Sequence, residues 1–476
     1  IPRKAQSHQL IASPQSALRG ITDDFTRQSM RLSRDRQGLP GNRRSFEAVG
    51  LQWYSPPTMP ADTPVKALIV AFTDAPPLAA YVINRLQPEL LCFFVPESAK
   101  TQVEEAVQPL VQQMPKRWDW VVTPDAADIV VCHQALSRTV HDLLRTWAVQ
   151  VGEVVVDLTG ATPAMAAALA TVSQPWTSRM ISLVDAAGSE ESEQITIDGL
   201  TKRWVQGNPW DESAAVVRRE ASEAFNQGSF RAAATLFHTL EARVSGGQKP
   251  LYRALAELAL GYGLWEQFQY RQAWEKLKTS LKALDMASIW GGPPGLKALL
   301  PLIKANSGFL EKMVLDPAEV KEGVVLDLLA HAHRRAHGDH DPERAMVALV
   351  RALEACAQRQ LFKQYKIKTW DVQPDQLPEA LRDTCRTSYL DDVDGKYKLP
   401  LQSQWRTLAG LGDQMGQAFL RDWPKMKPLL DAANHAVLGH GFEAVKGERV
   451  QQLSDMVMKL TGVSESSLPK FPVLSL

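Results

Sequence analysis

The stretch VVVDLTGATPAM at residues 154–165 decides the fold of the N-terminal half of the chain. Its three valines are typical of a buried strand, Gly160 relieves the steric limit at a turn, and residues 164–170 are strong helix formers. The first amides of such a helix are unpaired, and Thr159 and Thr162 add hydroxyls beside them. This pattern favours a phosphate-bearing ligand, although an ordinary strand-to-helix connection is the alternative that the stretch leaves open.

Apolar runs alternate with helical patterns between residues 65 and about 185. This alternation predicts right-handed crossovers and a mostly parallel sheet. The predicted strands are 67–72, 90–95, 118–122 and 129–132, and the predicted helices are 78–86 and 101–114.

Polar residues follow the first two of these strands. Ligands of parallel sheets bind outside the carboxyl ends of the strands, so we expect Thr73, Asp74 and Ser98 to converge with the turn at 159–162. The sequence lacks the GxGxxG spacing of dinucleotide sites and the lysine of a Walker A loop. Binding of NAD and hydrolysis of ATP are therefore disfavoured.

The composition is that of a globular protein with about three domains, at roughly 150 residues per domain. Its 476 residues carry 53 Lys and Arg against 53 Asp and Glu, so a nucleic-acid site must be a local patch. We find no run of eighteen apolar residues and no signal peptide, which predicts a cytoplasmic protein that is not in the membrane. The four cysteines are scattered and predicted to be reduced core residues, without a disulfide framework or a metal site: Cys92, Cys132, Cys356 and Cys385.

The N-terminal segment differs from the rest of the chain. Residues 1–49 hold nine Arg and Lys against four Asp and Glu, which is typical of a solvated basic arm. Docking of this arm on a protein or on nucleic acid is the alternative. The sequence starts at Ile1 rather than at Met, which leaves open that a preceding segment was removed.

Helical spacing dominates after residue 208. Predicted helices at 214–226, 230–243, 251–268 and 271–284 resemble tetratricopeptide-type pairs, but without a clean repeat of 34 residues, so we predict an irregular helical scaffold. An aromatic cluster in this region is predicted to be helix–helix core, with base stacking as the alternative: Trp265, Phe268, Tyr270 and Trp274.

The last third of the chain is also predicted to be helical, with helices at 326–336 and 343–360. A later helix is predicted to end near 442, with His440 placed just before the C-terminal Gly441. His333 and His337 lie four residues apart on one helix face. Because no cysteine or HExxH glutamate accompanies them, we predict a polar helix end rather than a metal site.

Two separated motifs resemble one known family. Residues 157–165 are similar to the DxTGGTxxM signature of the CARF domain, a Rossmann-like sensor of cyclic oligoadenylates in type III CRISPR systems. Residues 327–336, 351–354 and 434–441 resemble the HEPN ribonuclease domain of CARF–HEPN proteins, in which the last motif typically reads RNxSILAHG. The resemblance covers about residues 65–460.

The resemblance implies an α/β Rossmann-like CARF domain followed by an all-α region. We expect a basic arm at 1–60, the CARF domain at 61–200, the helical scaffold at 205–315 and the HEPN domain at 316–476. In the sensor, the turn at 159–162 would contact the cyclic oligoadenylate, and Met165 would pack below the turn. The loops that follow the first two strands would complete the pocket. The ligand residues implied are Thr73, Asp74, Ser98, Thr159, Gly160, Ala161, Thr162 and Met165, of which Ala161 replaces the usual glycine.

In the effector half, His440 matches the family histidine and Asn434 the polar residue of its motif, but Ala433 stands where the family has arginine. The resemblance implies metal-independent cleavage of single-stranded RNA through its own 2′-hydroxyl, in a site shared by a homodimer and without a cofactor. Arg334 and Arg335 either contact RNA or form salt bridges at a helix end. Alanine at position 433 is either an engineered change or a natural one. Because of it, the alternative to a ribonuclease is a non-catalytic scaffold that binds cyclic oligoadenylate and recruits a partner protein.

Overall fold

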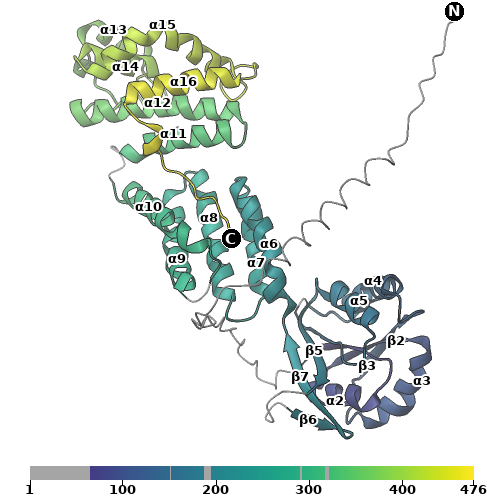
Figure 1. Ribbon diagram of the computed structural model, residues 1–476. Coiled ribbons are helices and arrows are strands. Elements are labelled where there is room, and N and C mark those ends of the chain that lie inside the picture. The colour runs from purple at the N-terminus through teal and green to yellow at the C-terminus, as the bar shows by residue number, and fades with distance from the viewer. Residues whose placement is uncertain (1–64, 151, 187–193, 290–291, 317–320) are drawn as a thin grey trace, which may run out of the picture. The chain divides into compact units, whose positions relative to one another are not determined.

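The computed structural model describes residues 65–150, 152–186, 194–289, 292–316 and 321–476 (Figure 1). The predicted basic arm at 1–60 lies outside the described residues. Among the described residues, the segment before Asn208 is built around one sheet, and the segment after it is helical.

The sheet of the N-terminal domain has the strand order β3-β2-β1-β4-β5-β7-β6. The first five strands in this order are parallel, and β7 adds antiparallel to β5 and forms a hairpin with β6. The predicted parallel sheet is therefore confirmed, with an antiparallel edge that the sequence analysis did not predict. The strands are β1 (Ala67–Ala71), β2 (Leu90–Pro96), β3 (Arg117–Thr123), β4 (Val154–Asp157), β5 (Thr177–Asp185), β6 (Gln194–Ile197) and β7 (Leu200–Gly207).

Helices cover both faces of this sheet (Figure 1). On one face, α2 (Pro76–Leu86) and the irregular helical segment 97–110 pack against Leu68 and Val70 of β1. On the other face, α4 (Ile129–Thr146) and α5 (Pro163–Ser173) pack against Ala67 and Ile69. Successive residues of β1 face opposite layers, which is why the strand is apolar throughout.

Two local predictions in this domain were wrong. Residues 129–132 begin α4 rather than forming a strand, because the Asp128 carboxylate accepts hydrogen bonds from the amides of Val130 and Val131 and caps the helix. The helix predicted at 101–114 ends by Leu110 and includes a π-helical turn at Val103–Val107. Its last turn is a 3₁₀ turn that contains Pro109, a residue that cannot donate the next backbone hydrogen bond.

The helical region has two separate apolar cores. The first lies among α6 (Pro209–Asn226), α7 (Phe230–Arg243), α8 (Lys249–Glu266), α9 (Tyr270–Ile289) and α10 (Leu296–Leu315). The second lies among α11 (Glu322–His337), α12 (Pro342–Tyr365), α13 (Glu379–Ser388), α14 (Leu401–Gly410), α15 (Gln414–His435) and α16 (Gly447–Thr461). The predicted α/β domain followed by an all-α region is confirmed.

The aromatic cluster belongs mainly to the first helical core, as predicted. Trp265 is fully buried, and Tyr270 and Trp274 pack at the edge of the core. Phe268 is the exception, because it is 41% exposed at the turn between α8 and α9.

The C-terminal segment returns from the second helical core to the first. Phe471 packs against the rings of Phe230, Tyr262 and Trp265. The Asn226 side chain donates to the carbonyl of Leu474 at 2.9 Å and accepts from the amide of the same residue at 2.7 Å. The last residues therefore tie the two helical bodies together.

All four cysteines are buried and free, which confirms their prediction as core residues. Burial raises the pKa of Cys356 to about 11, so its thiol stays protonated at neutral pH. No helix within the described ranges is long and apolar enough to cross a membrane.

Candidate functional sites

The carboxyl ends of β1 and β4 lie where the strand order of the sheet reverses. Connections run from β1 toward β3 on one side and from β4 toward β5 on the other. In sheets of this type, the gap outside the carboxyl ends of these two strands is the usual ligand site. Thr73 follows β1 and donates a hydrogen bond of 2.9 Å to the carbonyl of Gly160, so the structure brings the two predicted loops together.

Gly160 permits the close approach of the two loops. A Cβ atom at this position would lie 2.8 Å from the Ala71 carbonyl oxygen and 3.3 Å from the Cα of Phe72. Any side chain would push the turn away from the end of β1. Ala161 is not among the residues with a positive φ, so the alanine at this position causes no backbone strain.

The side chain of Asp157, the last residue of β4, holds the start of the turn at 159–162. One oxygen of its fully buried carboxylate accepts from the Thr159 amide at 2.9 Å and from the Thr159 hydroxyl at 2.5 Å. The Thr159 oxygen in turn accepts from the amide of Leu183 on β5 at 3.0 Å. Burial raises the pKa of Asp157 to about 6, although the hydrogen bonds from Thr159 act against it. This role of Asp157 was not predicted from the sequence.

Thr162 caps α5, because its hydroxyl oxygen accepts from the amide of Met165 at 3.1 Å. The same hydroxyl donates to the carbonyl of Ala126, and Met165 is fully buried beneath the turn. The hydroxyl protons of Thr73, Thr159 and Thr162 are thus all used within the protein.

The backbone amides of the turn remain available for an anion. Within the described part of the chain, the amides of Gly160, Thr162 and Ala164 have no protein acceptor. They are clustered at the N-terminus of α5, where the helix dipole also favours negative charge. The site is therefore chemically suited to a phosphate bound by backbone N–H groups.

The remaining predicted sensor residues lie at the same edge of the sheet. Asp74 is exposed and precedes Ala75, which adopts a left-handed φ of 62° at the start of α2. Ser98 is exposed in a short 3₁₀ turn after β2, where the sequence predicted a loop. Within the described residues, neither side chain forms a hydrogen bond to the turn at 159–162.

His440 lies in a turn after α15 and not at the end of a helix as predicted. The helix ends at His435, and Ala436 then forms a parallel bridge with Glu443. The backbone amide of His440 donates 2.8 Å to the carbonyl of Asn434, which links these two predicted catalytic residues directly. The side chains of both residues are exposed.

Glycines are required on both sides of His440. A Cβ atom on Gly439 would lie 2.2 Å from the Ala433 carbonyl oxygen, and one on Gly441 would lie 2.2 Å from the His435 carbonyl oxygen. The lack of a Cβ atom at both positions lets the chain fold back closely against the end of α15. Ala433 is half-buried in the last turn of α15, immediately before Asn434.

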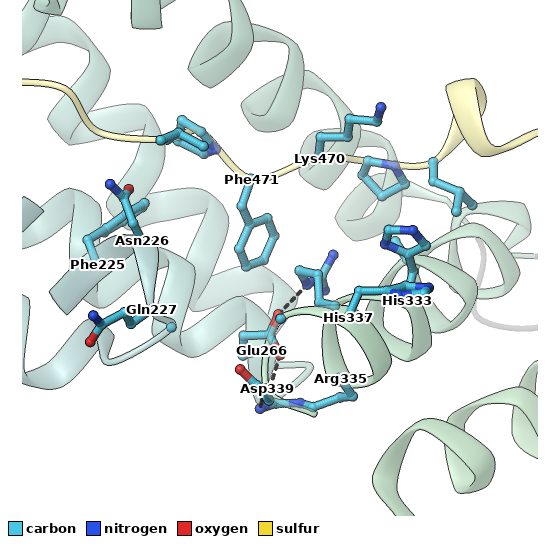
Figure 2. A pocket seen from close by; sticks show the side chains of 18 of the residues that line it. Phe225, Asn226, Gln227, Glu266, His333, Arg335, His337, Asp339, Lys470 and Phe471 are labelled. Carbon is cyan, nitrogen blue, oxygen red and sulfur yellow. Dashed lines mark hydrogen bonds and ion pairs between the residues drawn. The ribbon is translucent and has the colours of Figure 1, made fainter. Parts of the chain in front are cut away.

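Arg334 and Arg335 form ion pairs within the protein. Both contact Glu266 at the end of α8, with N–O distances of 2.5 and 2.6 Å, and Arg335 also pairs with Asp339. Figure 2 shows Phe471 pointing from the C-terminal segment into the cavity that these residues line. The guanidinium of Arg334 lies 4.0 Å from the centre of the Phe471 ring. Of the two roles predicted for these arginines, the structure shows the salt bridges.

A buried carboxylate completes this charged cluster. Asp327 of α11 accepts from the indole of Trp265 at 2.8 Å and from the hydroxyl of Tyr270 at 2.9 Å. Neither Glu266 nor Asp327 was predicted from the sequence as a partner in this cluster. A signal existed for Asp327, because an acidic residue inside the apolar run VVLDLLA indicates a buried, hydrogen-bonded carboxylate.

His333 and His337 line the same cavity, which has a volume of about 470 Å³. The centres of their rings lie 4.5 Å apart, and the imidazole of His333 approaches the Glu465 carboxylate at 3.4 Å. Burial and the nearby His337 lower the pKa of His333. Within the described ranges, no group of three or more His, Cys, Asp or Glu is placed to hold a metal ion.

Two family models match adjacent parts of the chain. The Csm6 6H domain matches residues 214–310, and the Csm6 HEPN domain matches residues 318–464. Together the two matches cover more than half of the sequence. The chain belongs to the CARF–HEPN ancillary proteins of type III CRISPR systems. The family resemblance stated from the two motifs is confirmed.

A solved structure shares this fold. Csm6 of Enterococcus italicus, bound to cyclic hexa-2'-fluoro-hexa-dAMP, superposes with a TM-score of 0.52 at 12% identity, over 83% of this chain and 94% of that one. Can2 of Sulfobacillus thermosulfidooxidans, in complex with cyclic tetra-adenylate, gives a TM-score of 0.21 at 14% identity, over 64% of this chain and 70% of that one. No curated protein matches the sequence.

Proposed function

We propose that this CARF–HEPN protein is a cyclic oligoadenylate sensor that controls cleavage of single-stranded RNA in the cytoplasm. The observation that carries the proposal is the amide-lined turn at the switch point of the sheet, in the same chain as a HEPN domain. The ring phosphates would bind the amides of Gly160, Thr162 and Ala164, while Thr159 and Thr162 hold the turn in shape. Thr73, Asp74 and Ser98 would form the surrounding wall.

For the effector half, we propose metal-independent cleavage by the 2′-hydroxyl of the RNA. His440 would transfer the proton, and Asn434 would orient the phosphate through its amide. Two copies of the turn would face each other in a homodimer, and binding of the ring would favour one of two dimer arrangements. No metal or other cofactor takes part in this chemistry.

Ala433 favours a second candidate function. Alanine offers neither charge nor hydrogen-bond donors at the position where the family holds the scissile phosphate with arginine. The alternative is a regulatory scaffold that binds cyclic oligoadenylate and recruits a partner protein without cutting RNA.

Charge at position 161 tests the sensor assignment. We expect Ala161→Asp to weaken binding of cyclic tetra- or hexa-adenylate by at least about 100-fold, because a carboxylate beside the free amides repels the ring phosphates. The matched control is Ala161→Asn, which has nearly the same shape without the charge and should cost less than about tenfold. Calorimetric titration with each ring size gives the dissociation constants.

If Ala161→Asp and the unmodified chain bind both rings with equal affinity, the turn does not bind the ring phosphates and the proposal is wrong. Binding of only one ring size would set the size of the activator. Circular dichroism on each variant checks that the domain is folded before the titration.

A further inference from the structure

Glu343 holds the turn that carries His440 from a different helix. It lies in the first turn of α12, which begins after the cap residue Asp341. Its carboxylate accepts a hydrogen bond of 2.9 Å from the amide of Val445 and a longer one of 3.4 Å from the amide of Leu438. Leu438 precedes His440 and Val445 follows it, so the Glu343 side chain binds the turn on both sides of His440.

Backbone hydrogen bonds attach the turn to the end of α15, because the carbonyls of Ala433, Asn434 and His435 accept from the amides of Ala436, His440 and Glu443. These bonds set the shape of the turn, but they do not join it to α12. Several of its apolar side chains face solvent: Val437 is 59% exposed, Leu438 53% and Phe442 98%. Within the described residues, Ala436 and Val445 are the two buried members of the segment 436–446.

The chemistry of the contact suits a positioning role. A carboxylate that accepts two backbone N–H groups forms charge-assisted hydrogen bonds, which are stronger than those of neutral acceptors. Removal of the carboxylate leaves both amides without their acceptor. The backbone at residues 438 and 445 is then no longer held against α12, and His440 keeps only its attachment to α15 through the Asn434 carbonyl.

We propose that Glu343 is a positioning residue that fixes the direction of His440. It does not itself touch the substrate. The structural part of this proposal stands on the contacts of Glu343, and its consequence for RNA cleavage rests on the proposed nuclease function.

Amide hydrogen exchange, followed by NMR, tests the structural part without any need for RNA cleavage. In Glu343→Ala we expect exchange at Val445 to rise at least about tenfold, with a smaller rise at Leu438. Glu343→Gln keeps one acceptor oxygen and should retain part of the protection at Val445. Glu379→Ala is the matched control, since Glu379 is an exposed glutamate in the first turn of α13 and should leave both amides unchanged.

Cleavage kinetics then test the consequence. In a chain carrying Ala433→Arg, we expect Glu343→Ala to lower kcat about 10-fold or more with little change in KM, and Glu343→Gln to restore part of it. Unchanged exchange at Val445 in Glu343→Ala would overturn the proposal. Increased exchange with unchanged kcat would overturn the link to His440, whereas absence of cleavage in every variant, Ala433→Arg alone included, would contradict the nuclease function and leave the exchange result standing.

Discussion

Replacement of Glu266 by alanine is expected to lower the free energy of unfolding by about 3–5 kcal/mol, because it removes the carboxylate shared by two largely buried guanidinium groups. The Glu266 side chain is 10% exposed, and those of Arg334 and Arg335 are 21% exposed. His331 also approaches the Glu266 carboxylate at 3.0 Å. One carboxylate at the end of α8 thus serves three basic residues of α11, at the junction of the two helical cores.

This cluster also predicts a dependence of stability on pH. Burial alone raises the pKa of Glu266, but the hydrogen bond from His331 and the charges of Arg334 and Arg335 outweigh it and lower the pKa to about 2. A carboxyl whose pKa is lowered by folding stabilises the fold above its unfolded value and loses this contribution as the pH falls. The difference between the unmodified chain and Glu266→Ala should therefore shrink between about pH 4.5 and pH 2.

Urea unfolding at a series of pH values measures both effects. Glu220→Ala is the matched control, since Glu220 is an exposed glutamate of α6 whose replacement should change stability by less than about 0.5 kcal/mol. A loss below about 1 kcal/mol in Glu266→Ala at pH 7 would mean that the arginines find other partners. A difference that persists unchanged at pH 2 would contradict the assignment of the effect to the carboxylate charge.

The sensor fold was predictable because its signals are local. The buried valines at 154–156 and the alanine-rich segment after Pro163 define β4 and α5 without knowledge of the rest of the chain. The same approach failed at 129–132, where Ile-Val-Val-Cys has the composition of a strand. There the capping hydrogen bonds of Asp128 and the packing of α4 on the sheet outweigh the preference of β-branched residues.

The position of His440 was predictable only in part. The GHG sequence indicates a tight turn, but helical spacing from 429 onward obscures that the helix already ends at His435. Contacts across long sequence separations could not be predicted from the sequence. Glu266 and Arg335 are 69 residues apart, and Glu343 and Val445 are 102 apart, and no periodicity of one segment encodes such pairs.

Replacement of Ala433 by arginine is expected to raise RNA cleavage by about 100-fold or more when the activating cyclic oligoadenylate is bound. Position 433 lies in the last turn of α15, one residue before Asn434, whose carbonyl holds the amide of His440. A guanidinium there would bring a fixed positive charge and a planar set of donors to the scissile phosphate. The measurement is cleavage of a fluorescent single-stranded RNA, with no ligand and with cyclic tetra- or hexa-adenylate.

Three further variants distinguish a specific role of the arginine at position 433 from the effect of an added positive charge. Ala432→Arg adds the same charge at the neighbouring half-buried position and should not raise cleavage. Ala433→Lys should recover less activity than Ala433→Arg, because an ammonium lacks the paired donors. His440→Ala in the chain with Ala433→Arg should abolish the gain, because the proton transfer then has no imidazole. Ala433→Arg could cut no RNA with either ring while the ring still binds at the turn of the sensor. That result would contradict the nuclease function and favour the scaffold that recruits a partner protein.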